Sequence, residues 1–319
     1  MRRLPRLVLL ASLCALLLAQ IADARVLLAT HGSKERLRSQ TGQRSDGEMK
    51  FVGWNKGMTW GNDFAEWWPE MGNVPIISLG TNNRWKREAI TPRGIAMGNG
   101  DRYLKAFGRA INAWGGPIII RPMAEMNGHW NFYSAYNANG TRRNAAHSQR
   151  NFRRAFKRLY LILHGGDRAA INRKLRRSGM PPVSGRLPEN PYPTLRVVWN
   201  PQGFGSPNVP GNRAHVYYPG DAYVDLVAND LYSIGYRAEW KANLALFRRY
   251  RNKPYAIGEF GLWGIDHPDF VRRIGSFIRN HPRVKLAIFF EAERGSTFDL
   301  ASKPRSRAAY RNHIARLNR

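Results

Sequence analysis

Eight short apolar runs constrain the fold of this chain more than any other feature. Each run is almost continuously apolar, which is typical of parallel strands buried on both faces. Between several of them, apolar side chains recur at helical spacing, as in Asp101 to Trp114, Ser148 to His164 and Pro268 to Asn280. This alternation predicts an α/β fold, a single (β/α)8 barrel with its helices outside. The runs are Val26 to Ala29, Phe51 to Trp54, Val74 to Leu79, Pro117 to Ile120, Leu195 to Trp199, Val224 to Ala228, Tyr255 to Gly258 and Leu286 to Phe290.

The first 24 residues have the pattern of a secretory signal peptide. Arg2, Arg3 and Arg6 precede an apolar stretch from Leu7 to Leu18, and Ala22-Asp23-Ala24 supplies small residues for cleavage. The apolar stretch is shorter than the roughly 20 residues that span a bilayer. We therefore expect a secreted protein, extracellular or periplasmic, whose barrel domain is residues 25–319 with no membrane span after cleavage.

The formal net charge of +29 predicts attraction to polyanions. Arginine and lysine are spread over most predicted helices, and no zinc finger, helix-turn-helix or RNA-recognition signature gathers them. This favours association with an anionic envelope or an acidic polymer over specific binding of nucleic acid. The 10 tryptophans suit a carbohydrate binder, because sugar faces stack on indole rings.

Two glutamates follow apolar runs where a barrel would carry its active site. Glu125 follows the fourth run and Glu259 the seventh, with Gly258 and Gly261 leaving room for a ligand near the backbone. Strands four and seven face each other across a barrel mouth, so both carboxylates can flank one sugar ring. A pair about 5–5.5 Å apart suits a retaining glycosidase, with one nucleophile and one acid/base. The alternative is a structural ion pair, for which Arg121 is the nearest partner of Glu125 in sequence.

Four motifs together resemble glycoside hydrolase family 26, which contains β-mannanases and members that cleave xylan or mixed-linkage glucan. The resemblance implies a retaining barrel hydrolase with Glu125 as acid/base, Glu259 as nucleophile, Tyr232 bonded to the nucleophile and Trp130 lining the sugar site. The chain departs from the family pattern at Ala124, where family members usually have a histidine that helps to position the site and the sugar. The motifs are Arg121 to Trp130, Val198 to Pro201, Tyr217 to Asp225 with Asp230-Leu231-Tyr232, and Gly258 to Gly261.

The expected function is therefore a secreted endo-β-glycanase, with β-mannan as the default substrate. Xylan, β-glucan or an exopolysaccharide are alternatives within the family, and a non-catalytic barrel that binds polysaccharide is the alternative outside enzymes. No metal-ligand spacing or phosphate-binding loop is present, so no cofactor or metal is predicted.

Further side chains are candidates for contact with substrate because they lie near predicted strand ends. Glu291 and Glu293 are the rival catalytic carboxylates, whereas a structural role is expected for Asp225 and Asp230. Four early tryptophans either extend a polysaccharide groove or pack in the core. The additional substrate contacts are Arg121, Asn127, Trp199, Asn200 and Phe290, and the tryptophans are Trp54, Trp60, Trp67 and Trp68.

Overall fold

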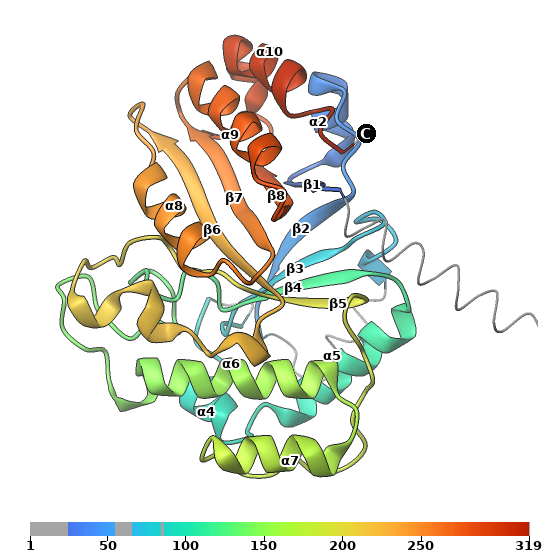
Figure 1. The fold of residues 1–319 in the computed structure, drawn as a ribbon, viewed down its shortest axis with the longest axis vertical. Helices are drawn as coiled ribbons and strands as arrows, with labels where there is room; N and C mark the ends of the chain where they lie inside the picture. The colour runs from blue at the N-terminus through green and yellow to red at the C-terminus, as the bar shows by residue number, and fades with distance from the viewer. Residues whose placement is uncertain (1–24, 55–65, 84–85, 319) are drawn as a thin grey trace, which may run out of the picture.

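The computed structural model describes residues 25–54, 66–83 and 86–318, which form a closed barrel of eight parallel strands in sequential order (Figure 1). The predicted (β/α)8 barrel is confirmed. The predicted leader, residues 1–24, and Trp60 lie outside the described residues. The strands are β1 Leu27–His31, β2 Gly47–Val52, β3 Ile76–Leu79, β4 Ile118–Pro122, β5 Leu195–Trp199, β6 Leu226–Ile234, β7 Tyr255–Trp263 and β8 Val284–Phe290.

Helices surround the barrel, and several begin at the residues that the sequence pattern predicts. Ser148 caps α6 by accepting the backbone N–H of Asn151, and Pro268 occupies the first turn of α9, where a missing N–H is tolerated. No helix of the described residues is long and apolar enough to cross a membrane. The helices are α2 Lys34–Thr41, α4 Pro92–Ala96, α5 Asp101–Trp114, α6 Gln149–His164, α7 Arg168–Arg177, α8 Trp240–Arg249, α9 Pro268–Asn280 and α10 Pro304–His313.

Two connections depart from a regular alternation of strand and helix. Short 3-10 helices, including Pro210–Asn212, Ala214–Tyr217 and Asp221–Tyr223, join β5 to β6 in place of an α-helix. Between β4 and β5 the chain carries α7 in addition to α6, and Figure 1 shows α7 beyond α6, away from the strands. The proline-rich segment 178–194 leads from α7 into the start of β5, so it lies on the rim opposite the carboxyl ends of the strands.

The predicted second strand was displaced along the chain. The strand is Gly47–Val52, so Phe51 stands near its end and is half exposed. Trp54 lies beyond it and packs against Tyr103, with ring centroids 4.2 Å apart. The apolar run of residues 51–54 therefore comprises the end of β2 and, beyond it, Trp54, which packs in the core.

Side chains alternate along the strands between two buried layers. Leu27 and Ala29 belong to a cluster inside the barrel, whereas Leu28 belongs to the cluster between strands and helices. Mostly branched and small side chains from all eight strand regions meet inside the barrel, as barrel interiors require. The inner cluster is Leu27, Ala29, Met49, Val74, Ile76, Ile119, Val198, Leu226, Ala228, Ala256, Leu286 and Ile288.

A buried ion pair fastens the helices on one side of the barrel. Arg158 of α6 is fully buried and donates two hydrogen bonds, 2.6 and 2.5 Å, to the Asp101 carboxylate at the start of α5. A third bond, 2.8 Å long, runs from Arg158 to the carbonyl of Pro181. This one guanidinium therefore joins α5, α6 and the proline-rich segment.

Candidate active site

The inward-facing positions of the barrel change from apolar to polar near the carboxyl ends of the strands. Two residues beyond the apolar Ile119, Val198 and Ala228 come Arg121, Asn200 and Asp230, on the same faces of β4, at the end of β5, and on β6. The same alternation that fills the barrel interior with apolar side chains therefore places the Arg121 guanidinium, the Asn200 amide and the Asp230 carboxyl group at its mouth.

A β-bulge in β7 turns Glu259 toward the same place. Strict alternation from the inward Ala256 would point residue 259 outward, but the pairing with β6 shifts so that Asn229 pairs with Ile257 and Asp230 with Glu259. The extra residue is Gly258. A Cβ there would lie 1.9 Å from Oδ1 of Asn200, so only glycine fits.

The room beside the glycines of β7 is filled by the protein's own side chains. The space at Gly258 is occupied by Asn200 and Asp230, and a Cβ on Gly261 would lie 2.9 Å from the ring of Tyr232. The prediction that these glycines admit a ligand is therefore wrong. They allow the residues around Glu259 to approach its backbone.

Two donors fix the Glu259 carboxylate. Nη1 of Arg121 lies 2.5 Å from its Oε1, and the hydroxyl of Tyr232 donates to its Oε2. Tyr232 lies within β6 and Glu259 within β7, because both strands extend further than the apolar runs indicated. Arg121 pairs with Glu259 rather than with Glu125, so the predicted structural pair of Glu125 with Arg121 is not formed.

Arg121 also binds Asp230, which makes this guanidinium the centre of the site. Its Nη2 donates to Oδ2 of Asp230, and its Nε donates to Oδ1 of Asn200 over 2.8 Å. Burial raises the pKa of Asp230 well above its usual range, Arg121 opposes that shift, and the nearby Glu259 and Glu125 add to it. Asp230 lies in a charged cluster in which its carboxyl group accepts a hydrogen bond from Arg121. This contact fits the structural role expected for Asp230.

Glu125 stands in a strained turn directly after β4. Met123 and Glu125 both have positive φ, 48° and 52°, which costs about 1–3 kcal/mol for each non-glycine residue. Hydrogen bonds hold the turn: the N–H of Glu125 donates to the carbonyl of Asn200 over 2.6 Å, and its own carbonyl accepts from Gly128 over 2.8 Å. From this turn the Glu125 side chain reaches the cavity that also contains Glu259.

Both oxygens of the Glu125 carboxylate have donors from loops. Nε1 of Trp130 lies 3.0 Å from Oε2, and Nε2 of Gln202, in the loop after β5, lies 2.8 Å from Oε1. The hydroxyl of the buried Tyr133 donates to the carbonyl of Ala124 over 2.5 Å. Burial raises the pKa of this hydroxyl most, and the nearby Glu125 raises it further. An aromatic hydroxyl from the following loop thus reaches the surroundings of Ala124.

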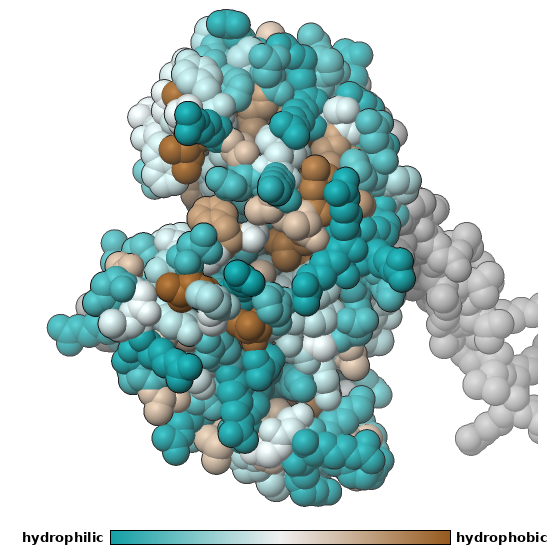
Figure 2. All heavy atoms as spheres, turned by 60° about the vertical axis from the view of Figure 1, so that its left-hand side comes forward, coloured by the Kyte–Doolittle hydropathy of each residue, from teal (hydrophilic) through white to brown (hydrophobic). Residues whose placement is uncertain are grey.

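A cavity of about 340 Å³ contains both glutamates, within the size range of ligand pockets. Trp130 and Phe51 lie on its edge and are each about half exposed. Figure 2 shows hydrophobic side chains gathered around a hollow on one face of the molecule, between hydrophilic surfaces. Arg121 and Ala124 also line this cavity. Because both Glu125 and Glu259 line it, one bound ligand can contact both carboxyl groups.

Two residues predicted to contact substrate, Trp199 and Asn127, lie away from the cavity. Trp199 is fully buried on the outer side of the barrel against Tyr218 and Tyr250, because the last residue of β5 follows the outward phase. Asn127 is buried and ties two loops together through hydrogen bonds to Gln202 and Phe204. These two predictions are wrong, since neither side chain reaches the cavity.

Phe290 and Asn200 also lie apart from the open cavity. Phe290 packs at the end of β8 against His31 and Tyr232, with centroids 4.5 and 5.8 Å apart, and borders a neighbouring depression. Asn200 is fully buried and holds Arg121. Both therefore support the residues around Glu259 rather than lining the 340 Å³ cavity.

The remaining candidates have structural surroundings. Glu291 is buried beside Arg36, 3.3 Å from its Nε, and Glu293 is exposed. Asp225 accepts the backbone N–H of Val197 over 2.7 Å at the start of β6, as its expected structural role requires. Trp54 and Trp68 are buried in the core, and Trp67 is partly buried against it.

Sequence reasoning missed Gln202 as a partner of Glu125. It directly follows the Val-Trp-Asn-Pro motif at the end of β5, and that position was the available signal. Among the described residues, no group of three or more His, Cys, Asp and Glu side chains is placed to hold a metal ion.

Comparisons with known proteins support the barrel fold. No protein-family profile matches the chain. A mannanase of Bacillus subtilis superposes with a TM-score of 0.54 at 19% identity, covering 93% of this chain and 88% of that one. A structure titled GH26A from Muricauda sp. MAR_2010_75 gives 0.56 at 18% identity over 94% of each chain. A Bacteroides ovatus β-mannanase of family 26 gives 0.54 at 15% identity over 93% and 90%.

The chain has the fold of family 26 β-mannanases. The resemblance predicted from the motifs is thereby confirmed at the level of the fold. In sequence, the chain is 23% identical over 292 residues to Endoglucanase H of Acetivibrio thermocellus, covering 86% of this chain. It spans only 28% of the length of that protein.

Proposed function

We propose that this chain is a retaining endo-β-glycanase with Glu259 as nucleophile and Glu125 as acid/base. The observation that carries the proposal is the shared cavity, in which Arg121 and Tyr232 hold Glu259 and a separate set of donors holds Glu125. Two carboxyl groups held by different neighbours suit two different tasks.

In the first step, the Glu259 carboxylate attacks the anomeric carbon of the bound sugar. Glu125 donates its proton to the glycosidic oxygen as the bond to the leaving saccharide breaks, and a glycosyl ester of Glu259 forms. In the second step, Glu125 removes a proton from water, which attacks the same carbon and releases Glu259. Both steps invert the carbon, so the product retains its configuration.

The surrounding groups support this division of roles. Arg121 and Tyr232 stabilise negative charge on Glu259 and, by binding one carboxylate oxygen each, fix its orientation. Arg121 also pairs with Asp230, and burial raises the pKa of that carboxyl group well above its usual range while Arg121 opposes the shift. The one guanidinium therefore fixes the position of both carboxyl groups.

The proposed substrate is β-mannan. Support comes from the mannanases among the similar structures, while the relative named Endoglucanase H keeps β-glucan open, and xylan or an exopolysaccharide are further candidates. Half-exposed Trp130 and Phe51 at the edge of the cavity suit a chain that passes through rather than ends there. Ala124 lines the same wall and makes it the position to vary when specificity is tested.

Azide rescue tests the two roles separately. With an aryl glycoside whose leaving group needs no acid, Glu125→Gln should regain turnover with azide and give the glycosyl azide of retained configuration. Glu259→Ala should give the glycosyl azide of inverted configuration, because azide replaces the nucleophile on the free face. Exchanged configurations would reverse the roles, and unimpaired hydrolysis by either variant would remove that residue from the mechanism.

The alternative outside enzymes is a barrel that only binds polysaccharide, and release of reducing ends from a polysaccharide panel separates it from the proposal. We also propose that residues 1–24 are removed on export. The mature protein recovered from culture medium or periplasm should then begin at Arg25.

A further inference from the structure

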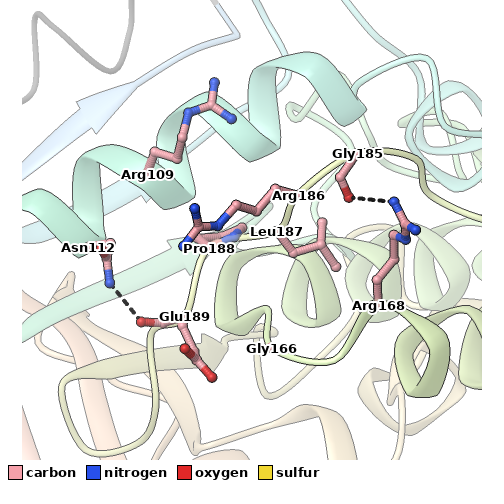
Figure 3. Close-up of a pocket in the computed structure, with 9 residues that line it drawn as sticks. All are labelled: Arg109, Asn112, Gly166, Arg168, Gly185, Arg186, Leu187, Pro188 and Glu189. Carbon is pink, nitrogen blue, oxygen red and sulfur yellow. Dashed lines mark hydrogen bonds between the residues drawn. The ribbon is translucent and has the colours of Figure 1, made fainter.

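A second cavity, with a volume of about 780 Å³, lies away from the active site. Its walls come from α5, from the start of α7 and from the proline-rich segment that leads to β5 (Figure 3). This is the rim opposite the mouth of the barrel. Neither catalytic glutamate belongs to it, so the cavity has no part in the proposed reaction.

Positive charge dominates this cavity. Arg109, Arg168 and Arg186 line it, one from each wall, and all three are exposed. Lys105 stands at the edge, where its Nζ donates to the carbonyl of Ser184 over 3.0 Å. Lys105 and Arg109 lie four residues apart on α5, a spacing at which like charges repel. A bound anion would relieve this repulsion.

The cavity also contains groups that suit a sugar better than a phosphate. Asn112 and Glu189 share one wall, where Nδ2 of Asn112 donates to the carbonyl of Glu189 over 2.8 Å. In the described part of the chain, the Glu189 carboxylate has no hydrogen bond or ion pair. A carboxylate in a cationic cavity can accept hydrogen bonds from the hydroxyl groups of a sugar, whereas an ionised phosphodiester group offers it no hydrogen-bond donor.

The walls of the cavity are fixed before any ligand arrives. Its floor is formed by the buried Leu187 and Pro188, and the N–H of Gly166 donates to the carbonyl of Pro188 over 2.9 Å. The side chain of the buried Asn190 donates to the carbonyls of Gly108 and Leu163 over 2.9 and 2.7 Å. A fixed site loses less entropy on binding than one that must order itself.

The start of α7 does not itself supply the anion site. Asp167 caps this helix, and its carboxylate accepts the backbone N–H groups of Ala169 and Ala170. An anion must therefore bind through the side chains of Arg109, Arg168 and Arg186.

We propose that this cavity binds an acidic oligosaccharide, with the arginines contacting sugar carboxylates and with Asn112 and Glu189 contacting hydroxyl groups. Nucleic acid is the less suitable polyanion, because no aromatic side chain of the described residues lines the cavity to stack a base, and phosphodiester groups offer Glu189 no hydrogen-bond donor. Through such a site the protein would bind an acidic polysaccharide at a position separate from the proposed active site.

Binding of a sized oligogalacturonate, measured by calorimetry at fixed salt, tests the proposal. The triple variant Arg109→Ala, Arg168→Ala, Arg186→Ala should bind at least about tenfold more weakly, because charge-assisted hydrogen bonds are lost. The matched control removes three exposed arginines from other parts of the surface: Arg44→Ala, Arg248→Ala, Arg316→Ala. The control should bind within about twofold of the unchanged protein, since screening limits distant charges.

Glu189→Ala decides between a sugar site and general attraction of anions. The proposal expects weaker binding of oligogalacturonate, although the substitution makes the cavity more positive. General attraction expects tighter binding. Tighter binding in Glu189→Ala, equal losses in the two triple variants, no binding of oligogalacturonate to the unchanged protein, or preference for single-stranded DNA at the same salt would each overturn the proposal.

Discussion

Tyr232 offers a substitution that removes one hydrogen bond from the site and little else. Its hydroxyl donates to Oε2 of Glu259, while its ring packs against Trp263, Phe290 and Phe298. Tyr232→Phe keeps these ring contacts and leaves Arg121 on the other carboxylate oxygen. A hydrogen bond to a charged acceptor contributes about 1.5–3 kcal/mol. If that contribution is made in the transition state, kcat/KM should fall about 10- to 150-fold.

The assay is the initial rate of reducing-end release from the best polysaccharide of a panel, with thermal unfolding measured in parallel. Tyr218→Phe is the matched control, because Tyr218 donates to Asp221 on the exposed surface and not to a glutamate of the site. The control should keep its rate. A Tyr232→Phe variant with an unchanged rate would refute the view that this hydroxyl stabilises Glu259. A loss as large as that of Glu259→Ala would show that Tyr232 does more than orient the nucleophile.

Three further predictions follow from contacts in the same structure. Gln202→Ala removes the 2.8 Å bond to Glu125 and should lower kcat/KM about five- to tenfold, with the fold intact by circular dichroism; an unchanged rate would exclude Gln202 from positioning the acid/base. Asp101→Ala leaves Arg158 buried without its carboxylate and should lower the free energy of unfolding in urea by about 3–5 kcal/mol, whereas a loss under about 1 kcal/mol would contradict the fastening role of the pair. Burial raises the pKa of Glu291, with Arg36 opposing, so its contribution to stability is present below the unfolded pKa and is lost as pH rises through the folded pKa. Glu291→Gln should therefore gain stability relative to the unchanged protein as pH rises above the unfolded pKa of about 4.3, measured by urea unfolding, and a difference that is constant with pH would contradict this.

The barrel could be predicted from sequence because its strands are buried on both faces. Leu195–Trp199 and the helices Asp101–Trp114 and Pro268–Asn280 have the predicted bounds, since apolar periodicity alone determines them. The ends of β6 and β7 could not be predicted in this way. These strands continue into polar residues, and pairing between the two strands, not apolarity, extends them.

The orientation of individual strand-end residues depends on contacts that the sequence does not display. The bulge at Gly258 reverses the face of Glu259, and no local pattern marks the extra residue. Trp199 lies on the outward face of the same strand end from which Asn200 reaches Arg121. The cavity beside α7 was missed for a related reason. Its arginines are far apart in sequence, and only the fold brings them together.

The central claim is that Glu259 forms a glycosyl ester that water then cleaves. Time-resolved proton NMR of the freshly released reducing ends, over the polysaccharide panel, tests it most directly. A retaining enzyme releases the β-anomer first, followed by slow mutarotation to the equilibrium mixture. The account predicts this order for the unchanged protein and no release for Glu259→Ala. First appearance of the α-anomer, or no release from any polysaccharide, would contradict it.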